Sequence, residues 1–131
     1  TQDDQKILTG SGTILLVDDE EMIIDVGAQV LKKLGYEVLT ARHGKQAVEV
    51  YQQNSQRIAI VILDLIMPEM GGGETYDRLK EIDPDVKVLL SSGYSLDGQA
   101  TEILNRGCDG FIQKPFSLKD LSQKLRQIIL G

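Results

Sequence analysis

The stretch "VILDLIMPEMGGG", residues 61–73, places a single carboxylate, Asp64, within a run of apolar side chains. Residues 61–63 and 65–67 on either side of it are all apolar. Burying a carboxylate among hydrocarbon is costly unless the charge has a partner. We interpret residues 59–63 as a buried strand that ends at Asp64, and the glycines of residues 71–73 as part of a loop that leads into a helix.

The same rhythm of short apolar runs and amphipathic stretches extends in both directions from this segment. Five strands are expected at residues 13–17, 36–40, 59–63, 86–90 and 110–113. Helical spacing is expected around residues 24–34, 47–51, 79–82, 95–105 and 118–129, the last opened by Ser117 as N-cap. Strands that alternate with helices predict an α/β domain, with a parallel sheet, right-handed crossovers and helices on both faces.

Composition limits the classes of function. The chain has 131 residues, enough for one domain, and its net charge of −6 disfavours direct binding of nucleic acid. No apolar run approaches the roughly 18 residues of a membrane span, so we expect no membrane contact by this domain. Cys108 is the only cysteine, which favours a reducing, cytoplasmic setting. Residues 1–12 are expected to form a flexible leader or linker, and residues 13–131 the domain.

Polar side chains collect where the expected strands end. Asp18 and Asp19 follow the first strand, Asp64 the third, a serine pair the fourth, and Lys114 the fifth. Sites in open parallel sheets lie beyond the carboxyl ends of the strands. Two carboxylates ~4 Å apart repel by roughly 4 kcal/mol at an effective dielectric near 20, so a cation is expected among the three aspartates.

These residue types fit a phosphoryl group. Oxygen ligands from a few carboxylates suit Mg²⁺ (or Mn²⁺), which often recruits a phosphate oxygen as well. Lys114 supplies a point charge for an anion, a serine hydroxyl can donate to another of its oxygens, and an aspartate can itself be the nucleophile.

In these motifs the chain resembles the receiver domains of two-component response regulators over residues 13–130. The matching motifs are "DD" at residues 18–19, "LDLIMPEMGG" at 63–72, "SSGY" at 91–94 and "DGFIQKPF" at 109–116. The resemblance implies a flavodoxin-like, doubly wound (βα)5 fold, a three-layer sandwich whose parallel five-stranded sheet has the order 2-1-3-4-5. It also implies a signalling domain that catalyses only its own phosphorylation and dephosphorylation.

The resemblance assigns roles to individual residues. Asp64 would accept a phosphoryl group from a phosphohistidine on a histidine kinase or a histidine phosphotransfer domain. Asp19 would bind Mg²⁺ directly and Asp18 largely through water, together with Asp64 and the backbone carbonyl of Ile66. Lys114 would pair with Asp64 or its phosphate, and the Lys114–Pro115 peptide bond would be cis.

Regulation is implied in the same way. Ser92, followed by the small Gly93, would be the switch hydroxyl, and Phe111 the aromatic that turns inward, a role that Tyr94 would share. The output surface would be the helix near residues 95–105, the strand 110–113 and the helix 118–129, a face that also allows a homodimer. The leader and the "SSGYS" segment look like the C-terminal receivers of hybrid sensor histidine kinases, and a stand-alone single-domain regulator is the alternative.

Three other classes of protein fit the same residues less well. A metal-dependent aspartyl-phosphate phosphatase of the haloacid dehalogenase type needs an acid two residues after its nucleophile, where this chain has Ile66. A flavodoxin-like FMN carrier would be repelled by Asp18 and Asp19, and a receiver that is never phosphorylated would not need the full acidic set. Simpler roles remain for single residues: the aspartates at 18 and 19 as helix caps, His43 as a solvated loop residue, and Cys108 as a small apolar residue.

Overall fold

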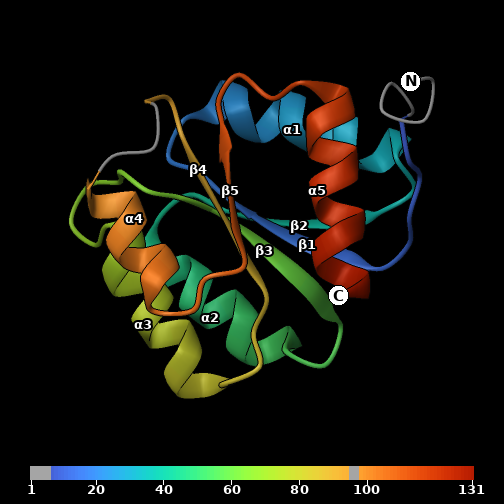
Figure 1. The fold of residues 1–131 in the computed structure, drawn as a ribbon. Coiled ribbons are helices and arrows are strands. Elements are labelled where there is room, and N and C mark those ends of the chain that lie inside the picture. Colours follow the sequence, from blue (N-terminus) through green and yellow to red (C-terminus); the bar gives the residue numbers. More distant parts are fainter. Residues whose placement is uncertain (1–6, 95–97) are drawn as a thin grey trace.

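The computed structural model describes residues 7–94 and 98–131, which form five strands and five helices in strict alternation (Figure 1). The elements are β1 (Thr13–Val17), α1 (Glu21–Lys33), β2 (Glu37–Ala41), α2 (Gly44–Asn54), β3 (Ile58–Asp64), α3 (Gly72–Ile82), β4 (Val88–Ser92), α4 (Gly98–Asn105), β5 (Gly110–Gln113) and α5 (Leu118–Leu130). The predicted alternation of strands and helices is confirmed.

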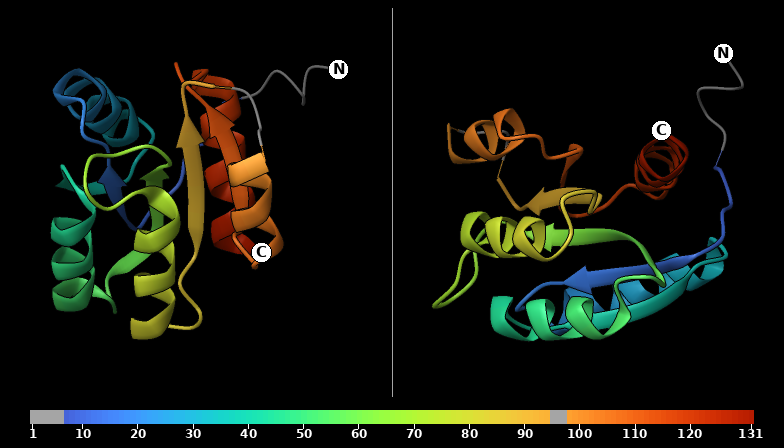
Figure 2. Two further views of the ribbon diagram at one scale, coloured as in Figure 1. Left: turned by 90° about the vertical axis from the view of Figure 1, so that its left-hand side faces the viewer. Right: turned by 90° about the horizontal axis from the view of Figure 1, so that it is seen from below.

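All five strands belong to one parallel sheet in the order β2-β1-β3-β4-β5. The left view of Figure 2 shows the strand arrows pointing toward the same edge of the molecule. The order reverses between β1 and β3, because β2 lies outside β1 and β4 and β5 follow on the other side of β3. The expected doubly wound, flavodoxin-like topology is therefore confirmed.

Alternation along the strands builds two hydrophobic cores, one on each face of the sheet. Leu15 and Val17 of β1 face the core beneath α2, α3 and α4, whereas Ile14 and Leu16 face the core beneath α1 and α5. Strand β3 alternates in the same way, so both faces of the central strands are apolar, as parallel sheets require. Figure 1 shows the resulting three layers, with α1 and α5 on one side of the sheet.

The strand bounds differ from the sequence prediction at the edge that matters for chemistry. Strand β3 includes Asp64 as its last residue, and β4 runs to Ser92 instead of ending near residue 90. The parallel register explains this, because Asp64 pairs with Ser91 and Ser92 pairs with Gln113. The first residues of the helix expected at 95–105 lie outside the described residues, and α4 is described from Gly98.

Residues 7–12 lie against the domain ahead of β1. Gly10 N donates to Leu34 O at 2.8 Å, and Leu8 N donates to Ser122 Oγ of α5 at 3.1 Å. The boundary between leader and domain stays a prediction. Across the described residues, none of the helices has the length and apolar character that crossing a membrane requires.

Candidate functional site

Backbone hydrogen bonds continue from the sheet into the first residues of the loops that hold the polar side chains. Asp18 N donates to Ala41 O at 3.1 Å, just beyond β1, and Lys114 N donates to Ser92 O at 2.7 Å, just beyond β5. Asp64 is itself within β3. The sheet therefore fixes the backbone positions of Asp18, Asp64 and Lys114, and their side chains meet at its carboxyl edge.

Lys114 joins two aspartates. Its Nζ lies 2.8 Å from Asp18 Oδ2 and 3.2 Å from Asp64 Oδ1, and both bonds have hydrogen-bond geometry. The side chains of Lys114, Asp18 and Asp64 are 9%, 1% and 5% exposed, so the ion pairs are screened very little by water. The partner that Asp64 was expected to need is present, and Asp18 shares it.

The charges in this cluster shift two pKa values. Burial, reinforced by the charge of Asp18, raises the pKa of Asp64 from 3.8 to about 7, although Lys114 acts in the opposite direction. Burial alone would lower the pKa of Lys114, but its bonds to Asp18 and Asp64 outweigh burial and raise it. One lysine therefore does not compensate two buried carboxylates, and a further positive charge would be stabilised here.

A divalent cation fits this need. Asp18, Asp19 and Asp64 each offer a carboxylate oxygen, and the three oxygens lie within 4.8 Å of one another. Carboxylate oxygens are the hard ligands that Mg²⁺ prefers. The oxygens of Asp18 already accept from Lys114 Nζ and from Glu20 N, the latter at 2.9 Å, whereas Asp19 lines the open cleft. This arrangement favours Asp19 over Asp18 as a direct ligand.

A cleft of about 490 Å³ opens onto the cluster. Its lining is Asp19, Glu20, Asp64, Ile66, Ser92, Gly93, Tyr94 and Lys114. Ser92 is buried and lies in this lining, whereas the adjacent Ser91 is equally buried and does not. Ser92 Oγ accepts a hydrogen bond from Tyr94 N at 3.1 Å, so the hydroxyl hydrogen is free to serve another acceptor.

The predicted aromatic residues occupy different places. Phe111 is half-buried in β5 and packs on the core beneath α2, α3 and α4, away from the residues that line the cleft. Tyr94 is 67% exposed at the rim of the cleft. Tyr94 therefore lies at the site, whereas Phe111 packs in the core and does not line the cleft.

Several smaller expectations are met. The Lys114–Pro115 peptide bond is cis. Cys108 is buried, and its thiol donates to Val88 O at 3.3 Å, so it packs as a small core residue. His43 is exposed, and its Nδ1 accepts from Gln46 N at 3.2 Å, which makes it the N-cap of α2. Asp18 Oδ1 accepts from the Glu20 amide, but Glu20 is the N-cap of α1 and the described residues give the helix no side-chain capping bond, so the simpler capping role of Asp18 and Asp19 is not met.

Two residues of the site were not predicted. No motif of the sequence marks Glu20, yet its Oε1 lies 3.8 Å from Lys114 Nζ and it lines the cleft. Arg42 follows β2, and its Nη2 donates to the backbone carbonyl of Asp19 at 3.3 Å. The rule that pointed to the other strand ends applies equally to β2 beside β1, and it would have identified Arg42.

Fold and site together define a doubly wound α/β domain whose carboxyl edge carries an acidic cluster and a buried lysine. The chain belongs to the response regulator receiver domain family, whose model matches residues 14–126. It is therefore a receiver domain of two-component signalling, as its motifs indicated.

Three relatives illustrate the likeness. The sensor kinase CckA of Brucella abortus is 36% identical over 122 residues, which are 93% of this chain and 13% of the kinase. The response regulator SaeR of Staphylococcus epidermidis is 30% identical over 116 residues, 88% of this chain and 49% of the regulator. A crystal structure of the receiver domain of the hybrid histidine kinase CckA superposes with a TM-score of 0.75 at 30% identity, covering 90% of this chain and 99% of that domain. This chain thus spans half or less of the two full-length relatives.

Proposed function

We propose that this receiver domain is a phosphoacceptor switch in which Asp64 takes a phosphoryl group from a phosphohistidine. The donor would be a histidine kinase or a histidine phosphotransfer domain. The observation that carries the proposal is the placement of Asp64, with Lys114 Nζ 3.2 Å from its Oδ1 and the carboxylates of Asp18 and Asp19 within 4.8 Å. This is the arrangement that a transferred phosphoryl group needs: a nucleophile, a metal site and a fixed cation.

In the transfer step a carboxylate oxygen of Asp64 attacks the phosphorus. The new O–P bond forms as the N–P bond to the donor histidine breaks, and the histidine nitrogen keeps the electron pair of that bond. Lys114 faces the oxygens of the transferred group, and Ser92 donates its free hydroxyl hydrogen to one of them. The chain would catalyse only this transfer and the later hydrolysis, and no other turnover.

The metal would be held by Asp19 and Asp64 directly, by Asp18 largely through water, and by the backbone carbonyl of Ile66. Mg²⁺ (or Mn²⁺) bound there supplies positive charge that neutralises the phosphoryl oxygens during transfer. Three carboxylates against one lysine support a resident cation, as does the raised pKa of Asp64, which burial and, after it, the charge of Asp18 produce.

Phosphorylation would then change the face built from α4, β5 and α5. Ser92 would move toward the phosphoryl group, and Phe111, with Tyr94 at the rim, would respond by repacking. Only a small local change in charge is needed to shift a two-state equilibrium of this kind. The same face is the expected contact for a homodimer.

The similarity to CckA supports a receiver within a hybrid histidine kinase. We further propose that the domain acts in the cytoplasm, without contact to membrane or nucleic acid. The similarity to SaeR keeps a response regulator, including a stand-alone one, as the alternative. A phosphatase of the haloacid dehalogenase type is disfavoured, because the position of its acid holds Ile66, an apolar side chain that is 52% exposed at the cleft.

Incubation with Mg²⁺ and acetyl phosphate, followed by intact mass measurement, tests the proposal. The wild type should gain one phosphoryl group, and Asp64→Asn should gain none. Asp25→Asn, at an exposed position of α1, is the matched control and should react as the wild type does. Chelating the metal should abolish the gain, and an unmodified wild type in the presence of Mg²⁺ would refute the acceptor role.

A further inference from the structure

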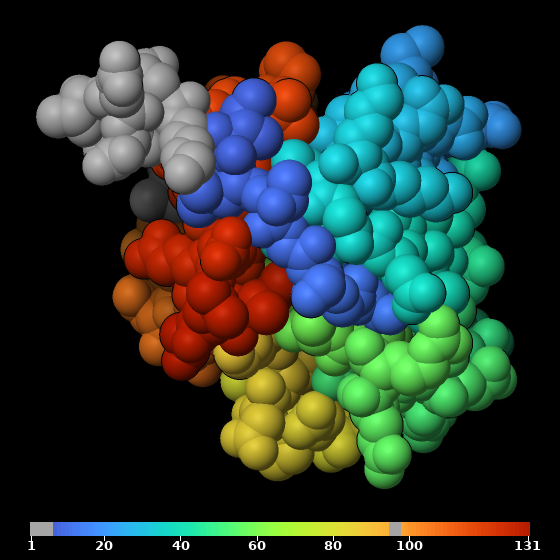
Figure 3. All heavy atoms as spheres, turned by 90° about the vertical axis from the view of Figure 1, so that its right-hand side faces the viewer, coloured from blue at the N-terminus to red at the C-terminus, as the bar shows by residue number. Residues whose placement is uncertain are grey.

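Three hydrogen bonds fasten residues 8–10, which we term the strap, to two helices of the same layer. Leu8 N donates to Ser122 Oγ at 3.1 Å, and Arg126 Nη1 donates to Thr9 O at 2.8 Å, so both of these bonds join the strap to α5. Gly10 N donates to Leu34 O at 2.8 Å, directly after α1. Figure 3 shows this segment running over the surface between α5 and α1.

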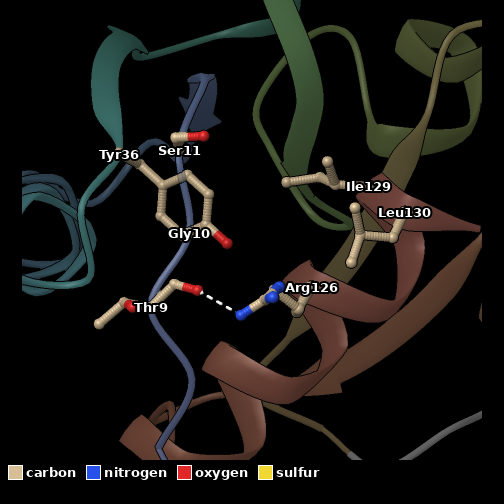
Figure 4. A pocket seen from close by; sticks show the side chains of 7 residues that line it. All are labelled: Thr9, Gly10, Ser11, Tyr36, Arg126, Ile129 and Leu130. Carbon is tan, nitrogen blue, oxygen red and sulfur yellow. Dashed lines mark hydrogen bonds between the residues drawn. The ribbon is translucent and has the colours of Figure 1, made fainter.

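Gly10 is the position of the strap at which an added side chain would collide with the domain. A side chain at Gly10 would overlap the Tyr36 hydroxyl and lie 2.8 Å from Cε1 of the same ring. Ser11, the next residue, is exposed. Figure 4 shows the backbone of the strap passing over Tyr36 on one side and reaching Arg126 on the other. Docking thus requires glycine at position 10 and tolerates other residues at position 11.

One feature of the docked strap is unfavourable, namely the buried hydroxyl of Tyr36. Tyr36 is 3% exposed, and among the described residues its hydroxyl has no hydrogen-bond partner. A buried hydroxyl without a partner is unfavourable, because it has given up its bonds to water. A cavity of about 390 Å³ lies between the strap and α5, lined in part by Tyr36, Arg126 and Leu130. Docking gains three hydrogen bonds and loses the hydration of one hydroxyl, so the two effects oppose each other.

The site reaches the strap through α5. Lys114, which binds Asp18 and Asp64, stands three residues before Ser117, the N-cap of α5. Ser122 and Arg126, which hold the strap, lie in the following turns of the same helix. A phosphoryl group on Asp64 gives Lys114 new oxygens to bind, and a shift of α5 relative to α1 would lengthen the bonds of the strap to one of the two helices. Hydrogen bonds weaken steeply with such displacement.

We propose that the strap is an intramolecular latch between α1 and α5 that loosens when Asp64 is phosphorylated, and so relays the switch to the chain that precedes the domain. The relay rests on the proposed function, whereas the docking of the strap does not. Since coupling is reciprocal, loosening the strap should also favour phosphorylation.

Hydrogen exchange of the Leu8 and Gly10 amides measures docking directly. In the wild type both should exchange at least tenfold more slowly than an undocked segment. Gly10→Ala should abolish this protection, and Ser11→Ala, its matched control, should leave it unchanged. Arg126→Ala, which alters an exposed side chain, should reduce it without threatening the fold. Tyr36→Phe removes the unpaired hydroxyl and should increase it several-fold. Unprotected amides in the wild type, or equal behaviour of Gly10→Ala and Ser11→Ala, would overturn the latch.

The relay is tested on the same amides after treatment with Mg²⁺ and acetyl phosphate, with phosphorylation followed by intact mass. Protection of Leu8 should fall several-fold in the phosphorylated wild type and stay unchanged in Asp64→Asn. Gly10→Ala should raise the phosphorylated fraction by a similar factor. Full phosphorylation with unchanged protection would overturn the relay alone. A wild type that gains no phosphoryl group would overturn the proposed function and the relay together. Hydrogen exchange of the Leu8 and Gly10 amides would still test whether the strap is docked.

Discussion

Lys114 Nζ lies closer to Asp18 Oδ2, at 2.8 Å, than to Asp64 Oδ1, at 3.2 Å. Asp18 is fully buried, and its other oxygen accepts from the Glu20 amide. Asp18 therefore does more than complete an acidic cluster, because it holds the lysine beside Asp64 and anchors the start of α1. A phosphoryl group on Asp64 would meet a cation that is already in place, which is how preorganised sites reduce the free energy of reorganisation.

Replacing Lys114 with alanine should leave two buried carboxylates without their shared counter-charge. Removing one partner of a buried ion pair destabilises a protein by about 3–5 kcal/mol. We expect a loss of this order in the free energy of unfolding at pH 8 without metal, measured by urea denaturation, and partial recovery on adding Mg²⁺. Lys45→Ala, at an exposed position of α2, should change the stability by less than about 0.5 kcal/mol. Equal stabilities for the two variants would contradict the central role of Lys114.

The raised pKa of Asp64 predicts a pH dependence of stability without metal. Asp64 titrates at about 7 in the folded chain and near 3.8 when unfolded, so between these values the folded state binds more protons. The contribution of Asp64 to the free energy of unfolding therefore falls by up to about 4 kcal/mol as pH rises from about 4 to about 7, at 1.36 kcal/mol per pKa unit. Above pH 7 this contribution is constant. Asp64→Asn should gain stability relative to the wild type across this window, measured by denaturation in EDTA. Parallel curves for the two proteins would contradict the raised pKa.

Binding of Mg²⁺ should depend on pH for the same reason. A metal ion needs the Asp64 carboxylate ionised, so it competes with the proton below about pH 7. Calorimetric titration should show the affinity for Mg²⁺ falling by up to about tenfold per pH unit below 7 and levelling off above it. Asp19→Asn should weaken binding at every pH, whereas Glu21→Gln, an exposed position at the start of α1, should not. An affinity for Mg²⁺ that is constant from pH 5 to 8 would rule out Asp64 as a ligand.

Two adjacent buried serines allow a clean test of the switch hydroxyl. Ser92 lines the cleft, whereas Ser91 does not, because successive residues of β4 face opposite sides of the sheet. Hydrogen bonds to charged groups contribute about 1.5–3 kcal/mol. Ser92→Ala should therefore slow phosphorylation by acetyl phosphate about tenfold or more, measured by intact mass against time. Ser91→Ala should react at close to the wild-type rate, and a reversed order would assign the hydroxyl role to Ser91.

The carboxyl ends of β1 and β5 were predictable, because short apolar runs stop close to Asp18 and Lys114. The ends of β3 and β4 lie one and two residues later than predicted, because the register with the neighbouring strands sets them. Which aspartate lies closer to Lys114 could not be predicted from the sequence. The answer depends on side-chain geometry at the ends of β1, β3 and β5. The position of Arg42 after β2 could have been found by the strand-end rule, but its partner could not, because the bond forms to the backbone carbonyl of Asp19. The docking of residues 8–10 also escaped prediction, because short polar segments rich in glycine carry no periodic signal.

A pair of adjacent glycines tests how rigidly the loop after β3 must hold Asp64. A Cβ at Gly72 would lie 2.8 Å from Asp64 O and from Leu65 Cα, both backbone atoms, whereas at Gly73 the nearest atom is Arg106 Nη2 of a flexible side chain at 3.4 Å. Gly72→Ala should therefore lower the free energy of unfolding by about 1–3 kcal/mol and slow phosphorylation, because relief of the overlap displaces Asp64. Gly73→Ala should be neutral or stabilising by up to about 1 kcal/mol within α3. Thermal unfolding measures the stability of both variants, and the time course with acetyl phosphate measures their rates of phosphorylation. Similar behaviour of the two variants would show that the loop adjusts without moving Asp64.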